Sequence, residues 1–329
     1  MTSDRPIRFG ILGTGSILRK YAEAFRLAHG VELIAVASRD ADRARAVAGQ
    51  YGIPHAHAGY ETLLTDDRVD AIINALHNGL HCELTCQALA AGKHVLCEKP
   101  LACSSAEVEQ MFAAAHRHGR WLLEGYMYRF HPQMAIIRQR LPELGRIVHI
   151  NSRRLSHGRE AGNPRFDPAL GGGALLDIGC YCVDFTCWIL DAEPTRATAI
   201  AHRNAAGVDL TTTATLEFTG NATSQFCCSF EAEPSFGAEI VGTEGRLVIP
   251  HPWLPPAWPA AFEVHHDLKT ETVRVELPAT APHFLVSFVN ELEHLADCIR
   301  QNRPPTVVTE ADSRRTMRAL ELVRRAAGY

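Results

Sequence analysis

The stretch Ile7-Arg8-Phe9-Gly10-Ile11-Leu12-Gly13-Thr14-Gly15-Ser16 decides the fold class. Its first half is a short apolar run, which is typical of a buried strand in a parallel sheet. Two glycines follow at once, and after them an amphipathic run extends to Gly30. A strand, a glycine turn and a helix in this order predict a phosphate-binding turn, in which Gly13 permits the bend and Gly15 lets the backbone approach the ligand.

The same alternation continues through the first part of the chain. A glycine turn without a ligand gives a similar pattern, and Leu18 stands where the usual fingerprint has a small residue. Strands that alternate with helices predict a doubly wound parallel sheet. We therefore expect an α/β Rossmann domain at residues 1–124. Its further strands are expected at 31–37, 70–75, 93–97 and 120–124, and its further helices at 41–50, 80–91 and 106–118.

The second strand ends in Ser38 and Arg39, where a fold that binds NAD would place an acidic residue for the ribose hydroxyls. A hydroxyl and a guanidinium instead suit a 2′-phosphate, because arginine offers a fork of donors and a fixed charge. The pattern therefore favours NADP. Asp40 follows, and it either caps the next helix or faces the ribose, in which case NAD is also accepted.

A third signal is Val95-Leu96-Cys97-Glu98-Lys99-Pro100, where an apolar run stops at a charged pair and a proline. Ligands of open α/β sheets bind beyond the carboxyl ends of the strands, so we expect Lys99 at a ligand site. A lysine beside a buried strand end can share its proton more readily than a surface lysine. The alternative is a strand-end lysine that reaches solvent.

After residue 124 the pattern changes. Strands follow one another without helices between them, which predicts an antiparallel sheet. We therefore expect residues 125–329 to form an α+β domain with a large, mostly antiparallel open sheet for substrate binding and oligomerisation. Its strands are expected at 145–151, 196–202, 210–218, 222–231, 238–241, 246–249, 262–266 and 273–277, and its helices at 133–141, 284–300 and 311–327.

The loop at 157–170 is long for a compact domain, and such loops are often functional. Four of its polar side chains are candidates to meet a hydroxylated substrate, namely His157, Arg159, Asn163 and Arg165. For each of them, a solvated loop residue explains the sequence at least as well. Trp253 and Trp258 cannot be assigned a role from the sequence.

A helix that opens after Gly171-Gly172-Gly173 carries Asp177 and Tyr181, which are four residues apart and so share a face that Asp184 continues. A tyrosine beside a lysine is a workable acid/base pair, because the ammonium lowers the pKa of the phenol. We therefore expect Tyr181 to exchange the proton of a carbinol during hydride transfer, with Lys99 tuning it. The alternative is that Asp177 and Tyr181 only pack at the domain junction.

Composition and charge exclude several classes of function. The net charge is −4 and no block of Lys and Arg is present, so we expect no nucleic acid as a partner. We also expect no membrane association, because no apolar run reaches the length of a span. Seven of the ten cysteines lie in helix-like or strand-like apolar patterns, which is typical of reduced core thiols. Without a signal-peptide core, we expect a cytoplasmic protein. No metal is expected either, since the following residues match no zinc spacing: His77, His81, Cys82, Cys86, His94 and Cys97.

Four segments together resemble the glucose-fructose oxidoreductase / inositol dehydrogenase (Gfo/Idh/MocA) family. The first, GTGSI at 13–17, is weak alone, whereas the other three in this order are specific. These three are GKHVLCEKP at 92–100, EGYMYRFHP at 124–132 and GGGALLDIGCY at 171–181. The resemblance covers nearly the whole chain, and it implies a Rossmann domain, a nicotinamide cofactor and an oxidoreductase activity.

The resemblance also implies roles for single residues. Lys99 is the family's catalytic lysine, and Asp177 is a polar residue on the substrate side. Many members have histidine at position 181, whereas the tyrosine here is similar to glucose-fructose oxidoreductase, NADP-dependent aldose (xylose) dehydrogenases and dimeric dihydrodiol dehydrogenases. The expected substrate contacts are Tyr126, His157 and Arg165. The expected cofactor-binding residues are Gly13, Gly15, Ser16, Ile17, Ser38, Arg39, His77, Asn78, His81, Glu98, Lys99 and Arg129.

The sequence thus predicts an NADP-dependent oxidoreductase that transfers a hydride between a sugar or polyol carbinol (an aldose C1 or a trans-dihydrodiol) and the nicotinamide, with NAD left open as a second cofactor. By the resemblance, a homodimer or homotetramer is expected through the open face of the C-terminal sheet. Two alternatives remain. A non-catalytic NADP-binding regulator would need neither Lys99 nor Tyr181. An NAD-dependent glycoside-cleaving member would need a retained NAD, which Ser38 and Arg39 fit poorly.

Overall fold

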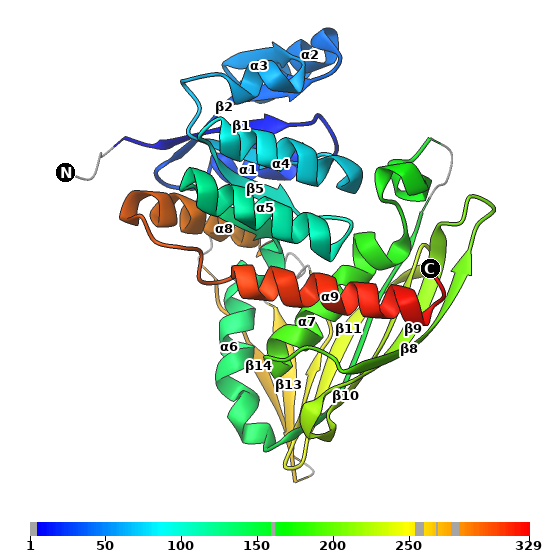
Figure 1. Cartoon of the computed structure of the whole chain (residues 1–329). Helices are drawn as coiled ribbons and strands as arrows, with labels where there is room; N and C mark the ends of the chain where they lie inside the picture. The colour runs from blue at the N-terminus through cyan, green and yellow to red at the C-terminus, as the bar shows by residue number, and fades with distance from the viewer. Residues whose placement is uncertain (1–4, 159–161, 254–259, 268, 278–282) are drawn as a thin grey trace. The chain divides into compact units, whose positions relative to one another are not determined.

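A computed structural model describes residues 5–158, 162–253, 260–267, 269–277 and 283–329 (Figure 1). The chain divides into two compact units. The first contains Met1–Ala102, Ala106–Phe130 and Leu285–Ser313, and the second contains Cys103–Ser105, His131–Phe284 and Arg314–Tyr329. The domain boundary expected after residue 124 stays a prediction.

The first unit is built on a six-stranded parallel sheet with the order β3-β2-β1-β4-β5-β6. This confirms the doubly wound sheet, in which the chain runs outward in both directions from β1 and β4. The strands β1, β4, β5 and β6 are mostly apolar and buried, as the unbroken hydrophobic runs predicted, whereas β3 at the edge of the sheet is not. Their bounds are β1 Ile7–Leu12, β2 Val31–Ser38, β3 His55–Ala58, β4 Ala71–Asn74, β5 His94–Glu98 and β6 Leu122–Gly125.

Helices connect these strands, and a later helix, α8, belongs to the same unit. The ring of Phe288 on α8 packs edge-on against Tyr21 on α1, with the ring centres 5.3 Å apart. The helix α1 ends at Phe25, earlier than the predicted stop at Gly30, because both Leu27 and Ala28 donate to the Ala24 carbonyl and close the last turn. The bounds are α1 Ile17–Phe25, α2 Ala41–Tyr51, α3 Tyr60–Leu64, η1 Asn78–Leu80, α4 His81–Ala90, α5 Ser105–His118, η2 Met127–Phe130 and α8 His283–Gln301.

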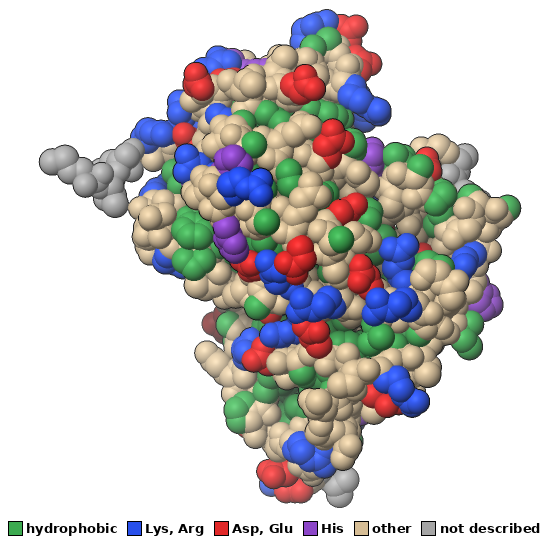
Figure 2. All heavy atoms as spheres, in the orientation of Figure 1, with side chains coloured by type: hydrophobic (Ala, Val, Ile, Leu, Met, Phe, Trp, Pro, Cys, Tyr) green, Lys and Arg blue, Asp and Glu red, His purple; other side chains and the backbone are tan. Residues whose placement is uncertain are grey.

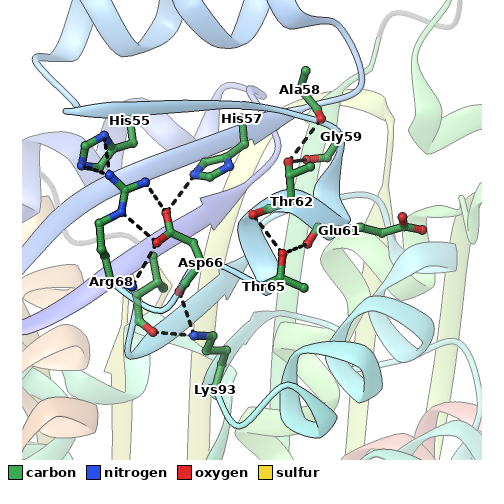
Figure 3. Close-up of polar contacts among 11 residues, drawn as sticks. His55, His57, Ala58, Gly59, Glu61, Thr62, Thr65, Asp66, Arg68 and Lys93 are labelled. Carbon is green, nitrogen blue, oxygen red and sulfur yellow. Dashed lines mark hydrogen bonds and ion pairs between the residues drawn. The ribbon is translucent and has the colours of Figure 1, made fainter.

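The strand β3 and the helix α3 were not predicted, because the sequence His55-Ala56-His57-Ala58 lacks the branched apolar residues typical of strands and α3 is too short to show a period. A polar cluster fixes this region (Figure 3). The carboxylate of Asp66 contacts both His57 at 3.1 Å and Arg68 at 2.7 Å. The buried ammonium of Lys93 donates to the backbone carbonyls of Asp66 and Val69 at 2.8 and 2.9 Å.

The second unit is built on an eight-stranded sheet with the order β14-β13-β12-β11-β7-β10-β9-β8. Its pairs are antiparallel apart from β7 with β10, which confirms the expected mostly antiparallel sheet. The bounds are β7 Ile147–His157, β8 Arg196–Arg203, β9 Asp209–Glu217, β10 Thr223–Ser229, β11 Glu231–Gly242, β12 Arg246–Ile249, β13 Ala261–His266 and β14 Lys269–Arg274.

Residues on one face of this sheet pack against helices, and those that alternate with them are more exposed. In β7, for example, Ile150 and Ser152 are buried whereas Asn151 and Arg153 are exposed. One apolar segment, Pro168–Leu190, has the length and hydropathy of a membrane span, but 89% of its most apolar window is buried, as in a core helix. The helices are α6 Pro132–Arg140, η3 Leu141–Leu144, η4 Pro164–Phe166, η5 Pro168–Leu170, η6 Leu175–Gly179, α7 Cys180–Leu190, η7 Thr219–Asn221 and α9 Glu310–Ala326.

The distribution of surface charges (Figure 2) and the state of the cysteines are as expected from the sequence. On the face shown in Figure 2, Lys and Arg side chains lie among Asp and Glu side chains rather than in a patch of one sign. The described residues contain no disulfide bond, and all ten cysteines are thiols. Several of these thiols lie fully inside the core, among them Cys97 and Cys182.

Candidate functional site

The glycine turn that follows β1 has the backbone that the sequence predicted. Gly13 has φ +101°, and a Cβ there would lie 3.0 Å from the Ala75 carbonyl oxygen, so only glycine fits without strain. Around Gly15 the space is open, since a Cβ would meet no atom of the described residues within 4 Å. Ser16 is the N-cap residue of α1, and its side chain makes no capping bond. The Leu18 N–H donates to the Gly15 carbonyl at 3.1 Å, so the N–H groups before it in this turn are the ones available to an anionic ligand.

Leu18 occupies the third position of the turn motif, where a small residue is usual. Its side chain is 2% exposed and packs in the core of the first unit. The larger residue is thus accommodated by the packing between helix and sheet, and the turn before it keeps its form.

Of the two roles expected for Asp40, the structure shows the helix cap. Its carboxylate accepts from the backbone N–H groups of Asp42 and Arg43 at 2.9 and 3.1 Å and so caps α2. Ser38 is buried, and Arg39 is exposed at the strand end. Arg43 was not singled out in the sequence, yet its Nη2 donates to the carbonyl of Thr14 in the glycine turn at 3.2 Å. Its position four residues after Arg39, in the first turn of α2, was the available signal.

Lys99 lies directly after β5, as expected, and its side chain is half-buried. The Lys99–Pro100 peptide bond is cis. The chain after it is held by the buried Glu124, whose Oε1 accepts from the Leu101 N–H at 2.8 Å. Gly125 allows β6 to pass close by, because a Cβ there would lie 3.2 Å from the backbone of Cys97 and of Glu98. Two residues of the 124–132 motif therefore support the turn that carries the lysine.

Glu98, the residue before Lys99, belongs to a cluster of acidic groups. The hydroxyl of Tyr21 on α1 is 2.8 Å from Oε1 of Glu98 and 3.2 Å from Oε2 of Glu291 on α8. Tyr21 and Glu291 are fully buried, whereas Glu98 is half-buried. Burial and the two carboxyl groups raise the pKa of Tyr21 well above its usual value. The sequence did not indicate Tyr21 or Glu291, because both read as core positions of amphipathic helices.

The loop after β4 carries His77, Asn78 and His81. His81 is fully buried, and its Nδ1 and Nε2 lie 2.8 Å from the Pro100 carbonyl and 3.2 Å from the Leu76 carbonyl. Burial lowers the pKa of His81 to about 4, so the ring is neutral and donates to one of the two carbonyls. His81 thus ties this loop to the turn that follows Lys99, and its expected contact with the cofactor stays a prediction.

The segment 124–132 places two other expected residues inside the first unit. The Nη2 of Arg129 donates to the Val307 carbonyl at 2.9 Å and lies 3.5 Å from Asp312, which joins this segment to the chain after α8. Tyr126 is fully buried, and its ring packs edge-on against that of Tyr128. The proposed contacts of Tyr126 with a substrate and of Arg129 with a cofactor stay predictions.

In the second unit, the glycine run positions Asp177. A Cβ on Gly172 would lie 2.5 Å from the Arg165 carbonyl oxygen, so glycine allows the two backbones to touch. Asp177 follows in a π-helical turn, and its Oδ2 lies 2.7 Å from Nε of Arg165. The structure therefore brings together two residues that the sequence predicted separately. Wide turns of this kind occur often at functional sites.

Tyr181 lies in the first turn of α7 and is 7% exposed. The guanidinium carbon of Arg154, on β7, lies 4.4 Å from the centre of its ring. The ring of Trp253 packs 5.9 Å away, and Trp253 is fully buried. The sequence left Trp253 without a role and missed Arg154, which follows Ile150 and Ser152 on the covered face of β7 and is a charge at a core-facing position.

The remaining candidate residues are not among the neighbours of Tyr181 described above. Asp184 is buried and accepts from the Thr316 hydroxyl on α9 at 3.3 Å, which is a packing contact. The ring of His157, at the end of β7, faces Glu233 at 3.6 Å. Arg159 and Trp258 lie outside the described residues. No group of three or more metal-ligating side chains occurs in the described part of the chain, so no metal site is assigned.

Two family models together match most of the chain. Residues 7–126 match the model of an oxidoreductase family with an NAD-binding Rossmann fold (GFO_IDH_MocA), and residues 139–248 match the GFO/IDH/MocA C-terminal domain. Trans-1,2-dihydrobenzene-1,2-diol dehydrogenase from Sus scrofa is 34% identical over 98% of this chain and 97% of its own length. The same enzyme from Homo sapiens is 32% identical over the same shares.

Solved structures agree over the whole length. KijD10, a 3-ketoreductase from Actinomadura kijaniata solved with NADP and TDP-benzene, has a TM-score of 0.88 at 30% identity, covering 98% of both chains. Aldose-aldose oxidoreductase from Caulobacter crescentus, solved with glycerol, has a TM-score of 0.87 at 26% identity, also over 98% of both chains. Both family models and these relatives point to one group of proteins, and this chain belongs to the Gfo/Idh/MocA family of oxidoreductases.

Proposed function

We propose that this protein is an NADP-dependent dehydrogenase or reductase that transfers a hydride between a sugar- or polyol-type carbinol and the nicotinamide. The carbinol is an aldose C1 or a trans-dihydrodiol. The observation that carries the proposal is the order of the strands in the first unit. Because β1, β4 and β5 are parallel neighbours, Gly13, His77 and Lys99 all follow carboxyl ends at one edge of the sheet. This edge is where open α/β sheets bind their ligands.

Two arginines support the preference for NADP. Arg39 and Arg43 are both exposed near the end of β2, and Arg43 contacts the glycine turn. The carboxylate that would favour the ribose hydroxyls of NAD, Asp40, is engaged in capping α2. Two guanidinium groups and the Ser38 hydroxyl suit a 2′-phosphate. KijD10, a similar structure, was solved with NADP.

Three residues are proposed to act on the substrate. When bound, the nicotinamide supplies the hydride chemistry. Tyr181 exchanges the proton of the carbinol through its hydroxyl, Lys99 favours the ionised phenol, and Asp177 orients the substrate. The ion pair between Asp177 and Arg165 supports the orienting role, because it fixes the carboxylate on the second unit. Relatives named as diol dehydrogenase and aldose-aldose oxidoreductase support a substrate with neighbouring hydroxyl groups.

A panel of cofactors and substrates tests the proposal. The full chain is mixed with NADP+ or NAD+ and a set of aldoses and trans-diols, and the absorbance of the reduced nicotinamide is followed. We expect turnover with NADP+, and a large loss of turnover in Lys99→Ala and in Tyr181→Phe. Full activity of both variants would contradict the roles. Stabilisation by NADPH without any turnover would favour a regulator, and cleavage of a chromogenic glycoside without net reduction would favour the glycoside-cleaving alternative.

We also propose that the protein forms a homodimer or homotetramer through the open face of the eight-stranded sheet, and that it is cytoplasmic. Exposed side chains such as Asn151, Thr213 and Gln225 lie on alternate positions of neighbouring strands in this sheet. Light scattering coupled to gel filtration measures the mass in solution. A monomer at micromolar concentration would contradict the assembly.

A further inference from the structure

One phenol hydroxyl in the first unit lies between two carboxyl groups. The Oη of Tyr21 is 2.8 Å from Oε1 of Glu98, within the usual range of an O–H···O hydrogen bond, and 3.2 Å from Oε2 of Glu291, slightly beyond it. A phenol carries one proton and can donate only one hydrogen bond. The second contact is therefore a hydrogen bond only if the other carboxyl group is protonated and donates to the phenol oxygen. If both carboxyl groups were ionised, one of them would face the phenol oxygen with no proton between them, and that contact would be repulsive.

Distance and burial indicate which carboxyl group holds the proton. The phenol donates to the nearer carboxyl group, Glu98, because 2.8 Å is the usual length of an O–H···O hydrogen bond and the contact to Glu291 is longer. Glu98 is half-buried, whereas Glu291 is fully buried. A carboxylate in water retains much of its hydration, whereas a buried one loses it and tends to bind a proton. Both observations place the proton on Glu291 and the negative charge on Glu98.

The charges around the cluster agree with this assignment. Burial raises the pKa of Glu98, but Lys99, the Tyr21 hydroxyl and Lys20 all act against this rise and favour the ionised form. The pKa of Glu291 is raised well above its usual value, mainly by burial and then by the charge of Glu98, and the hydrogen bond to Tyr21 offsets only part of this rise. Oε1 of Glu291 has no hydrogen-bond partner among the described residues. A carbonyl oxygen without a partner is less costly in the core than a carboxylate oxygen without one.

We propose that Glu291 is a neutral carboxylic acid at neutral pH and a positioning residue, which through the Tyr21 hydroxyl holds Glu98 in its ionised form beside Lys99. The chain of donors runs from Glu291 to Tyr21 and from Tyr21 to Glu98. It fixes the direction of both hydrogen bonds and keeps a single negative charge next to the lysine. The part of the proposal that concerns the chemistry of Lys99 rests on the proposed function, whereas the protonation of Glu291 does not.

Infrared difference spectroscopy of the full chain tests the protonation directly. At pH 7 the wild type minus Glu291→Gln spectrum should contain the carbonyl-stretch band of a protonated carboxylic acid. The matched control is Glu293→Gln, on the same helix, where the carboxylate is partly exposed and contacts His29; its difference spectrum should lack the band. The proposal is overturned if the wild type shows no such band, or if Glu98→Gln removes it while Glu291→Gln retains it.

Cofactor binding and turnover test the positioning role. The amide of Glu291→Gln can donate to Tyr21 as the acid does, so this variant should retain more NADPH affinity and kcat/KM than Glu291→Met, which cannot donate. Glu98→Gln removes the charge beside Lys99 and should lower kcat/KM roughly 10- to 100-fold, the size of a lost charge-assisted hydrogen bond. Equal losses in Glu291→Gln and Glu98→Gln would contradict the assigned direction of the bonds.

The measurements separate this proposal from the proposed function. If no substrate is turned over, the infrared band and the pH dependence of the melting temperature still report on Glu291 alone. If Glu291→Gln fails to fold, titration of the band in the wild type decides the question, because the band should persist well above pH 5, where an ordinary glutamate is ionised. Loss of the band near that pH would overturn the proposal.

Discussion

The guanidinium carbon of Arg154 lies 4.4 Å from the centre of the Tyr181 ring and 5.4 Å from that of Phe236, so the cation lies against two aromatic rings. Its Nε and Nη1 are buried and have no hydrogen-bond partner among the described residues, and no ion pair with those residues neutralises its charge. A cation in this place favours the ionised form of a phenol. The second unit thus supplies its own positive charge to the tyrosine that we propose as the proton carrier.

We therefore expect Arg154→Met to lower kcat/KM for the carbinol roughly 5- to 30-fold, the size of a partly desolvated cation–π contact. The pH–rate profile should also shift to higher pH, because the Tyr181 phenol then ionises at higher pH. The control is Arg146→Met, which removes an exposed arginine directly before the same strand. An unchanged pH profile in Arg154→Met would show that the arginine only packs.

The pair of Arg165 and Asp177 should matter more for substrate binding than for stability. The Arg165 side chain is 57% exposed, and ion pairs with an exposed partner contribute about 0–1 kcal/mol. We expect Arg165→Met to leave the melting temperature nearly unchanged and to raise KM, because Asp177 loses its fixed orientation. A double-mutant cycle with Asp177→Asn checks this. Additive effects on KM would mean that the two residues act separately.

Gly172→Ala should destabilise the second unit by about 1–3 kcal/mol, because the added Cβ overlaps the Arg165 carbonyl oxygen. The same change at Gly49, inside α2 and with open space around it, should stabilise the protein by about 0.5–1 kcal/mol. Urea unfolding of the two variants measures both values. Equal stability of Gly172→Ala and the wild type would contradict the close approach of the two backbones.

The lowered pKa of Asp66 makes the stability of the folded protein depend on pH. Arg68 and His57 hold the pKa of this carboxyl well below its usual value, despite partial burial. The folded state therefore binds its proton more weakly than the unfolded state does, and the stabilisation is present above about pH 4 and lost as the pH falls below it. Melting temperatures measured from pH 6 down to pH 3 should fall more steeply for the wild type than for Asp66→Asn. Parallel curves would exclude the contribution.

Cofactor choice should depend on the exposed arginines near β2. Arg39→Ala is expected to raise KM for NADP+ roughly 10- to 100-fold, as the loss of a charge-assisted bond to phosphate predicts, and to change KM for NAD+ little. Arg45→Ala is the control, since Arg45 is an exposed arginine on the following helix, α2, and pairs with Asp42. If Arg39→Ala weakens both cofactors equally, the arginine does not recognise the 2′-phosphate.

Much of the fold could be predicted because its signals are local. The apolar runs of β1, β4 and β5, each of which ends at a glycine or a polar residue, predicted buried parallel strands. The cap at Asp40 was foreseen as one of two roles, and the structure shows it. The strand β3 was missed, since alternating histidine and alanine carries no strand signal.

The sequence by itself determined the Rossmann domain, the large open sheet, the family and the positions of Gly13, Lys99, Asp177 and Tyr181, because each depends on residues that are close along the chain. Only the tertiary structure decided which groups surround them. Glu291 follows Glu98 by almost two hundred residues, yet both contact Tyr21, and Arg154 reaches Tyr181 from another element. Burial and electric fields depend on distances in space, so the proton on Glu291 and the cation on Tyr181 arise only when the chain is folded.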